Sequence, residues 1–235
     1  IAVAKTNKYA VSESGDTLEV IERPNGGMSV VLADGQTSGR GAKNISAMVV
    51  GKVISLISDG VRDGAAARAA SDALYTERNG KVTSTLNILS ADFQSQTIVI
   101  TRNNSTPMFI SRGDSIECIS DESVSIGTSR NIRPSITEYP LESGITIVIY
   151  TDGIRYAGDR VGQTLDICTL LQAMLEDQEP TAQEIADSIL STALHLDNNR
   201  PNDDMSVVVL RSYAIERDQI RRMLVRLPVP LVNDR

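Results

Sequence analysis

Residues 83–119 read TSTLNILSADFQSQTIVITRNNSTPMFISRGDSIECI and contain four short runs that are typical of β-strands. The runs are TSTLNIL, QTIVIT, PMFIS and SIECI, and only a few residues separate each run from the next. Two parallel strands need a connection of about a dozen residues or more. The region is therefore predicted to be an antiparallel meander, which argues against a parallel α/β fold.

Four further apolar runs flank the meander in the sequence. They are 17–21 (TLEVI), 29–33 (SVVLA), 145–150 (ITIVIY) and 206–210 (SVVVL). The total of roughly eight strands is above the size at which strands usually divide into two packed sheets. Several runs carry apolar residues on both faces of the predicted strand, which indicates that both faces are covered.

Candidate helices that could cover the outer faces lie at 40–58, 62–78, 163–177 and 181–197. The last of them is opened by Thr181 and Glu184, which match a capping box. Two sheets packed face to face, with helices on both outer sides, form an αββα sandwich of the α+β class. We predict this fold, with a parallel α/β fold as the alternative.

The composition of the chain limits the classes of partner. The 235 residues are 41% hydrophobic and carry a net charge of −7, which argues against nucleic acid or a membrane surface as the main partner. No basic-then-apolar leader opens the chain, so we expect a cytoplasmic protein. Cys118 and Cys168 are expected to be reduced structural thiols, and the single histidine, His195, to lie on the surface or pack on a helix.

Four aspartates stand at the ends of predicted strands. Asp34 and Asp152 follow two strands, whereas Asp16 and Asp203 come just before two others. In an antiparallel sheet the end of one strand lies beside the start of its neighbour, so all four carboxylates could gather on one rim. Carboxylates that are so close repel one another unless a cation binds them, and an all-oxygen ligand set suits Mg²⁺ or Mn²⁺.

Glycines follow two of these aspartates, in ADG (33–35) and TDG (151–153). A glycine allows the backbone to turn sharply and exposes a carbonyl, so Gly35 could give its oxygen to a metal ion. Because Asp-Gly is also one of the commonest turn dipeptides, each motif alone is weak. The prediction of a metal site depends on the combination of all four strand-end aspartates.

The ordered motifs SGD (14–16), ADGQTSG (33–39), TDG (151–153) and NDDMSVVV (202–209) resemble those of the metal-dependent serine/threonine phosphatases of the protein phosphatase 2C type, the PPM family. The resemblance covers about residues 1–211. Within the family it is strongest to the small bacterial SpoIIE-like branch, which includes RsbU and RsbX. NNSTPMFISRG (103–113) and SIGTS (125–129) are similar to further segments of that branch.

The resemblance implies a role for each matching residue. Asp34 would bridge two metal ions, and Gly35 would give its carbonyl oxygen to one of them. Asp152 and Asp203 would complete the coordination of the other ion. Asp16 matches the acidic position that holds a metal ion directly or through its water.

Two other positions would orient these ligands without binding a metal ion, Asp204 and Gly153. The resemblance identifies no substrate-binding residue. Lys5, Lys8, Arg40 and Lys43 are candidates for phosphate contacts because they lie near the acidic motifs, although basic residues are more often simply solvated.

One position departs from the family pattern. The usual D-G-x-G-x-G motif has a glycine where this chain has Thr37. We therefore keep a second hypothesis of another class, a catalytically weak adaptor of the same fold that binds a regulatory partner. A third hypothesis, a parallel α/β metal hydrolase acting on a small phosphoester, is disfavoured by the meander.

The resemblance implies that residues 1–211 form a phosphatase catalytic domain, followed by a helical extension and tail at 212–235. Two Mn²⁺ or Mg²⁺ ions would activate a water that hydrolyses phosphoserine or phosphothreonine. The expected substrate is a phosphorylated regulatory protein of a stress or sporulation partner-switching pathway, such as a STAS-type antagonist or a component of a stress complex. Neither cysteine lies in a C-x5-R context, so a cysteine phosphatase is not supported.

Overall fold

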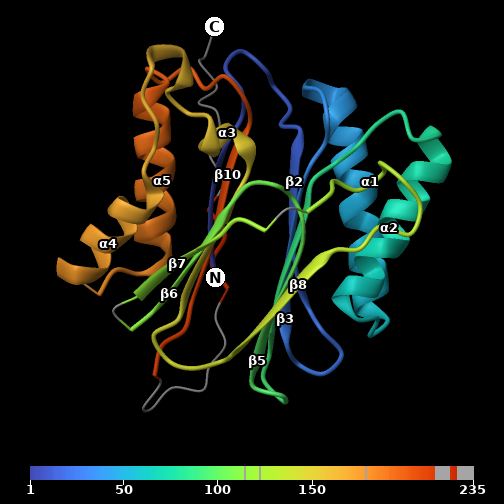
Figure 1. Ribbon diagram of the computed structural model, residues 1–235, viewed down its shortest axis with the longest axis horizontal. Coiled ribbons are helices and arrows are strands. Elements are labelled where there is room, and N and C mark those ends of the chain that lie inside the picture. The colour runs from blue at the N-terminus through green and yellow to red at the C-terminus, as the bar shows by residue number, and fades with distance from the viewer. Residues whose placement is uncertain (114, 122, 178, 215–222, 227–235) are drawn as a thin grey trace, which may run out of the picture.

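The protein, described here by a computed structural model, is a four-layered sandwich (Figure 1). The structure describes all residues except 114, 122, 178, 215–222 and 227–235. Two five-stranded sheets pack face to face, and a pair of helices covers each outer face. The predicted αββα sandwich is therefore confirmed. None of the helices in the described part of the chain has the length and apolar character needed to cross a membrane.

The first sheet has the strand order β1-β10-β9-β6-β7, and every neighbouring pair in it is antiparallel. Its strands are β1 (Ala2–Thr6), β6 (Met108–Arg112), β7 (Ser115–Ile119), β9 (Thr146–Tyr150) and β10 (Met205–Arg211). This sheet brings together segments far apart in the sequence, because β1 pairs along its whole length with residues 205–209 of β10.

The second sheet has the order β2-β3-β4-β5-β8 and is also antiparallel throughout. Its strands are β2 (Asp16–Glu22), β3 (Met28–Asp34), β4 (Leu86–Asp92), β5 (Thr97–Asn103) and β8 (Ser135–Pro140). Both sheets place a strand end and a neighbouring strand start at the same end of the sandwich, and this arrangement positions the site described below.

Three apolar layers explain why several strands lack polar alternation. On β3, Val30 and Leu32 pack between the two sheets, whereas Val31 and Ala33 pack beneath the helices. All four side chains are fully buried. A strand between two apolar layers carries apolar residues on both faces, as the run SVVLA (29–33) predicted.

The helices lie close to their predicted positions. They are α1 (Gly39–Ser58), α2 (Asp63–Arg78), the short α3 (Asp152–Arg155), a 3-10 turn η1 (Asp159–Val161), α4 (Ile167–Asp177) and α5 (Ala182–Leu196). The capping box of α5 is present, since the Thr181 hydroxyl accepts from the Glu184 amide and the Glu184 carboxylate accepts from the Thr181 amide. Helix α4 begins four residues later than predicted, because the Asp166 carboxylate accepts the Thr169 amide at 3.0 Å.

The prediction that residues 83–119 form one continuous meander is wrong at its centre. The pairs β4–β5 and β6–β7 are antiparallel hairpins, but β5 and β6 belong to different sheets. The connection between them crosses from one sheet to the other. The buried Arg102 guanidinium holds this crossing by donating to the carbonyl oxygens of Asn104 and Thr106. A short connection therefore excludes a parallel pair within one sheet, but it does not show that the two strands are neighbours.

The sequence did not predict two strands, β1 and β8, and one predicted helix lies mainly outside the described residues. Strand β1 is short, and β8 is an edge strand with alternating exposure that ends at Pro140. The expected helix after Arg211 falls mainly on 215–222 and 227–235, outside the described residues.

Candidate metal centre

Asp16 and Asp34 stand side by side at one end of the second sheet. Asp16 is the first residue of β2, Asp34 is the last residue of β3, and the two are partners in the antiparallel register. The Asp16 side chain is fully buried and Asp34 is half-buried. The pairing follows directly from the antiparallel hairpin, as the sequence predicted.

Asp152 and Asp203 come from the matching end of the first sheet. Asp152 is the first residue of α3, directly after β9, and Asp203 lies two residues before β10. The amide of Thr151 donates to the carbonyl of Ser206 at 3.0 Å, which keeps these two segments together. The four aspartates therefore do not share the rim of one sheet. They form two pairs on two sheets that face each other.

Two hydroxyl groups join the pairs across the sandwich. The Ser206 hydroxyl donates to Asp16 Oδ2 at 2.5 Å, and the Thr151 hydroxyl donates to the same oxygen at 3.1 Å. Sequence reasoning missed both residues. Their only signal was position, because each lies next to an acidic motif, in TDG (151–153) and in DDMS (203–206).

Electrostatic repulsion among the carboxyls is strong. Burial, followed by the charges of Asp16, Asp152 and Asp203, raises the pKa of Asp34 to about 9. Burial also raises the pKa of Asp16 to about 6, and burial with the Asp203 charge raises the pKa of Asp152. The Asp34 carboxyl lies within hydrogen-bonding reach of Asp16 and Asp152. All four groups thus share one electrostatic site.

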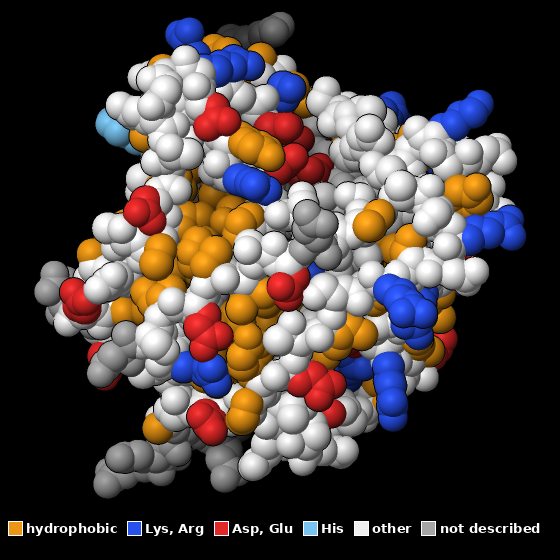
Figure 2. Space-filling model, in the orientation of Figure 1, with side chains coloured by type: hydrophobic (Ala, Val, Ile, Leu, Met, Phe, Trp, Pro, Cys, Tyr) orange, Lys and Arg blue, Asp and Glu red, His pale blue; other side chains and the backbone are white. Residues whose placement is uncertain are grey.

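The donor set of this site fits a hard divalent cation. Every candidate ligand is an oxygen, as Mg²⁺ and Mn²⁺ prefer, and Asp16 Oδ1 is buried without a hydrogen-bond partner. Across the described part of the chain, no three acidic, histidine or cysteine side chains already stand close enough to enclose an ion. The carboxyls of this site would therefore have to move closer together to coordinate one. Figure 2 shows acidic side chains gathered in a recess at the end of the molecule near α3.

Glycines 35 and 153 serve close backbone packing. Neither Gly35 nor Gly153 has a positive φ, so the expected sharp turn does not explain why a glycine stands at these positions. A Cβ on Gly35 would lie 2.2 Å from the carbonyl oxygen of Ala42, and a Cβ on Gly153 would lie 2.1 Å from that of Asp204. Gly153 therefore lets α3, which begins with Asp152, pack against the segment that carries Asp203 and Asp204.

Asp204 fixes the loop that precedes Asp16. Its carboxylate is buried and accepts the backbone amides of Lys8 at 2.9 Å and Gly15 at 2.7 Å. Both oxygens are therefore occupied by the protein itself. This geometry supports the role expected for Asp204, orientation of the ligands.

Two of the four candidate basic residues point into the site. The Lys5 ammonium donates to the Asp16 carbonyl oxygen at 2.7 Å, and the Lys43 ammonium donates to the same oxygen at 3.3 Å and to the Thr17 hydroxyl at 2.9 Å. Burial lowers the pKa of Lys5, and the nearby Asp16 charge opposes that shift. Arg40 is exposed at the start of α1.

The comparison with known proteins identifies the family. Residues 24–213 match the sequence profile of the family described as Stage II sporulation protein E, SpoIIE. The chain belongs to the SpoIIE family. The stage II sporulation protein E of Priestia megaterium is 24% identical over 209 residues, which cover 89% of this chain and 35% of that protein. The chain thus spans about a third of the length of this SpoIIE relative.

Solved structures carry the same fold as this SpoIIE-family chain. The PP2C phosphatase domain of SpoIIE from Bacillus subtilis, with a fragment of its regulatory domain, superposes with a TM-score of 0.78 at 21% identity. The match covers 91% of this chain and 63% of that one. The catalytic domain of the phosphatase PstP, solved with two manganese ions, gives a TM-score of 0.67 at 17% identity over 88% of this chain and 95% of that one. The predicted place in the SpoIIE-like branch and the PP2C-type fold are therefore confirmed.

Four residues singled out in the sequence have clear surroundings in this SpoIIE-family fold. Thr37 has a φ of 97°, so the loop keeps the left-handed backbone that a glycine would favour, at a cost in strain. His195 is exposed on α5, as expected. Cys118, like Cys168, is a free thiol.

Proposed function

We propose that this chain hydrolyses phosphoserine or phosphothreonine on a bacterial regulatory protein, with Mn²⁺ or Mg²⁺ as its cofactor. The observation that carries the proposal is the convergence of four aspartates from two sheets on one partly buried, repulsive site. Membership of the SpoIIE family and the PP2C fold support this reading, as do the two manganese ions in the PstP structure.

The proposed ligands follow from position and chemistry. Asp34 lies at the centre, because the three other aspartates all contribute to its raised pKa, and it is the residue best placed to bridge two ions. Asp152 and Asp203 approach from one sheet, and Asp16 and Gly35 from the other. When bound, two divalent ions would supply an activated water and positive charge for the phosphoryl group.

The remaining residues of the site hold this arrangement in place. Ser206 and Thr151 fix the side chain of Asp16 across the two sheets through its Oδ2, which leaves its Oδ1 without a hydrogen-bond partner. Asp204 fixes the loop before Asp16. Lys5 and Lys43 place positive charge at the Asp16 carbonyl, which offsets part of the repulsion and could attract the phosphate dianion.

The wider biological setting also belongs to this proposal. We assign the activity to residues 1–211, with 212–235 as an extension, and place the protein in the cytoplasm. The substrate would be a phosphorylated regulator of a stress or sporulation circuit, with a STAS-type antagonist or a stress-complex component as the first choice. The net charge of −7 fits a protein partner better than nucleic acid or a membrane surface.

Substitution of the central carboxylates tests the proposal. Asp34→Asn and Asp152→Asn should each reduce Mn²⁺-dependent hydrolysis of a phosphoserine protein by more than about 100-fold, because each replaces a negatively charged ligand of the ions that would activate the water. Circular dichroism should show an intact fold. Asp59→Asn is the matched control, since Asp59 is exposed at the end of α1, and it should retain full activity.

Two outcomes would count against this assignment. Unchanged hydrolysis by Asp34→Asn would contradict the assignment of this metal centre as the catalytic site. Stable binding of a phosphorylated partner by the unaltered protein, with no turnover at saturating Mn²⁺, would favour the adaptor instead, and the strained backbone at Thr37 is the observation that keeps that alternative in view.

A further inference from the structure

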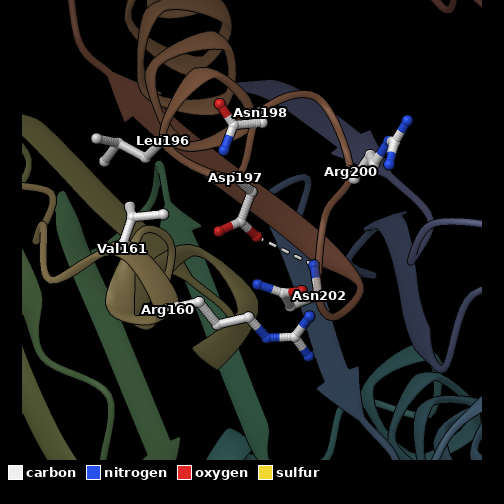
Figure 3. Close-up of a pocket in the computed structure, with 7 residues that line it drawn as sticks. All are labelled: Arg160, Val161, Leu196, Asp197, Asn198, Arg200 and Asn202. Atoms are coloured by element: carbon white, nitrogen blue, oxygen red, sulfur yellow. Dashed lines mark hydrogen bonds between the residues drawn. The ribbon is translucent and has the colours of Figure 1, made fainter.

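A pocket of about 460 Å³ lies next to the segments that carry the catalytic aspartates (Figure 3). One wall is the turn 158–162, which follows α3 and therefore Asp152. The other wall is the end of α5 and the segment up to Asn202, which directly precedes Asp203. A ligand in this pocket would therefore contact segments that lead to the proposed metal ligands Asp152 and Asp203.

The buried Asp197 carboxylate builds the pocket. Its Oδ1 accepts the Gly158 amide at 2.9 Å, and its Oδ2 accepts the Asn202 amide at 3.0 Å, the bond drawn in Figure 3. The two walls are thereby joined through one side chain. Because both oxygens are bound by backbone amides, Asp197 is committed to the architecture of the pocket.

Two arginines bring positive charge to the pocket, Arg160 beneath Asp197 and Asn202, and Arg200 at the outer rim with its side chain pointing away from Asp197 (Figure 3). Arg160 and Arg200 both line it and are exposed, and neither forms a salt bridge with any residue that the structure describes. The Arg200 guanidinium lies 5.5 Å from the ring centroid of Tyr9, and the Tyr9 amide donates to the Pro201 carbonyl at 2.9 Å. The contact with the Tyr9 ring restricts the positions that the Arg200 side chain can adopt.

We propose that this pocket binds an acidic side chain of the phosphoprotein substrate, close in its sequence to the phosphorylated residue. The proposal rests on the proposed phosphatase function and adds a specificity determinant to it. Arginine is the side chain best suited to recognise a carboxylate, through paired N–H donors. In a chain with a net charge of −7, two unpaired arginines beside an acidic site favour an acidic substrate segment that the rest of the surface would repel.

The shape of the pocket agrees with a protein side chain as its occupant. Val161 is 52% exposed and Leu196 is half-buried, and together they form an apolar edge beside the arginines. Such an edge can contact the methylene groups of a glutamate or of a neighbouring residue. Inorganic phosphate has no apolar part and would leave this edge uncovered.

Steady-state kinetics of the full chain with Mn²⁺ test the proposal. Three substrates are compared: p-nitrophenyl phosphate, a phosphoserine peptide flanked by glutamates, and the same peptide with glutamines in their place. Arg160→Gln and Arg200→Gln should each raise KM for the acidic peptide about three-fold, and the double variant about ten-fold. The kcat for that peptide, and all parameters for the two other substrates, should not change.

Arg130→Gln is the matched control. Arg130 is also an exposed arginine that lies over a tyrosine ring, that of Tyr75 in α2, and neither residue lines the pocket. It should leave every parameter unchanged. An equal loss for the acidic and neutral peptides in the pocket variants would overturn the proposal. A weaker inhibition by inorganic phosphate in those variants would do so too, because the arginines would then hold phosphate itself.

A binding measurement separates this proposal from the proposed function. Fluorescence anisotropy of the labelled acidic phosphopeptide, in the presence of a metal chelator, requires no turnover. Weaker binding by the double variant supports the proposed role of the pocket, whether or not the chain hydrolyses any of the three substrates. Absence of hydrolysis would contradict only the phosphatase assignment. Equal binding by the unaltered protein and the double variant would remove the pocket alone.

Discussion

Replacement of Asp16 by asparagine should stabilise the metal-free protein at neutral and alkaline pH. The folded protein raises the pKa of Asp16 from 3.8 to about 6, mainly through burial. A shift of about two units corresponds to about 3 kcal/mol. The sign follows from proton binding: between about pH 4 and pH 6 the folded protein holds more protons than the unfolded chain, so stability falls as pH rises through this window and stays low above it.

Asparagine removes this cost without removing the contacts of the side chain. Its Oδ1 can still accept from Ser206 and Thr151, and its amide can donate to Asp34, which lies within hydrogen-bonding reach of residue 16. Allowing for imperfect fit, we expect a gain of about 2 kcal/mol at pH 8, or about 4–8 °C in Tm. The gain should vanish near pH 4.

Thermal unfolding with a chelator, from pH 4 to pH 8, measures the effect. Asp204→Asn is the matched control: both Asp204 oxygens accept backbone amides, so an amide group there would face a donor and lower stability by about 1–3 kcal/mol. Saturating Mn²⁺ should reverse the order of the native protein and Asp16→Asn, since the metal stabilises the form that binds it better. A variant that is less stable than the native protein at pH 8 without metal, or a difference independent of pH, would refute the reasoning.

Two further predictions concern the backbone. Thr37 has a φ of 97°, which is strained for a β-branched residue, so Thr37→Gly should raise stability by about 1 kcal/mol in urea unfolding, whereas Thr37→Val should give no gain. Equal stabilities of all three proteins would show that the loop is relaxed. Gly153→Ala would place a Cβ 2.1 Å from the Asp204 carbonyl oxygen and should cost about 2–3 kcal/mol together with activity, while Gly51→Ala, on α1 with open space around it, should stabilise by about 0.5–1 kcal/mol. Unaltered stability and turnover in Gly153→Ala would show that α3 can shift freely.

Much of the fold was predictable because burial on two faces leaves a direct pattern. The run 30–33 is apolar at every position, and the structure places its residues alternately in two different apolar layers. The capping box of α5 was equally readable, because Thr181 and Glu184 act through local contacts. The crossing between β5 and β6 was not, since it depends on the distant packing of Arg102.

The candidate metal centre also has a part that the sequence predicts and a part that it does not. Strand ends revealed the aspartates, because adjacent strands in an antiparallel sheet bring ends and starts together, as Asp16 and Asp34 show. Their division between two facing sheets, and the hydroxyls of Thr151 and Ser206 that join them, required tertiary structure. A serine next to an acidic motif carries no sequence signal of a bond to a residue 190 positions away.

The most direct test of a shared metal site is a calorimetric titration with Mn²⁺ at pH 8, repeated in buffers of different ionisation enthalpy. Because the pKa of Asp34 is raised to about 9, metal binding should displace its proton into the buffer, about one per protein. Asp34→Asn should abolish both the tight binding and the proton release. Tight binding by that variant, or binding to the native protein without proton release, would contradict the account.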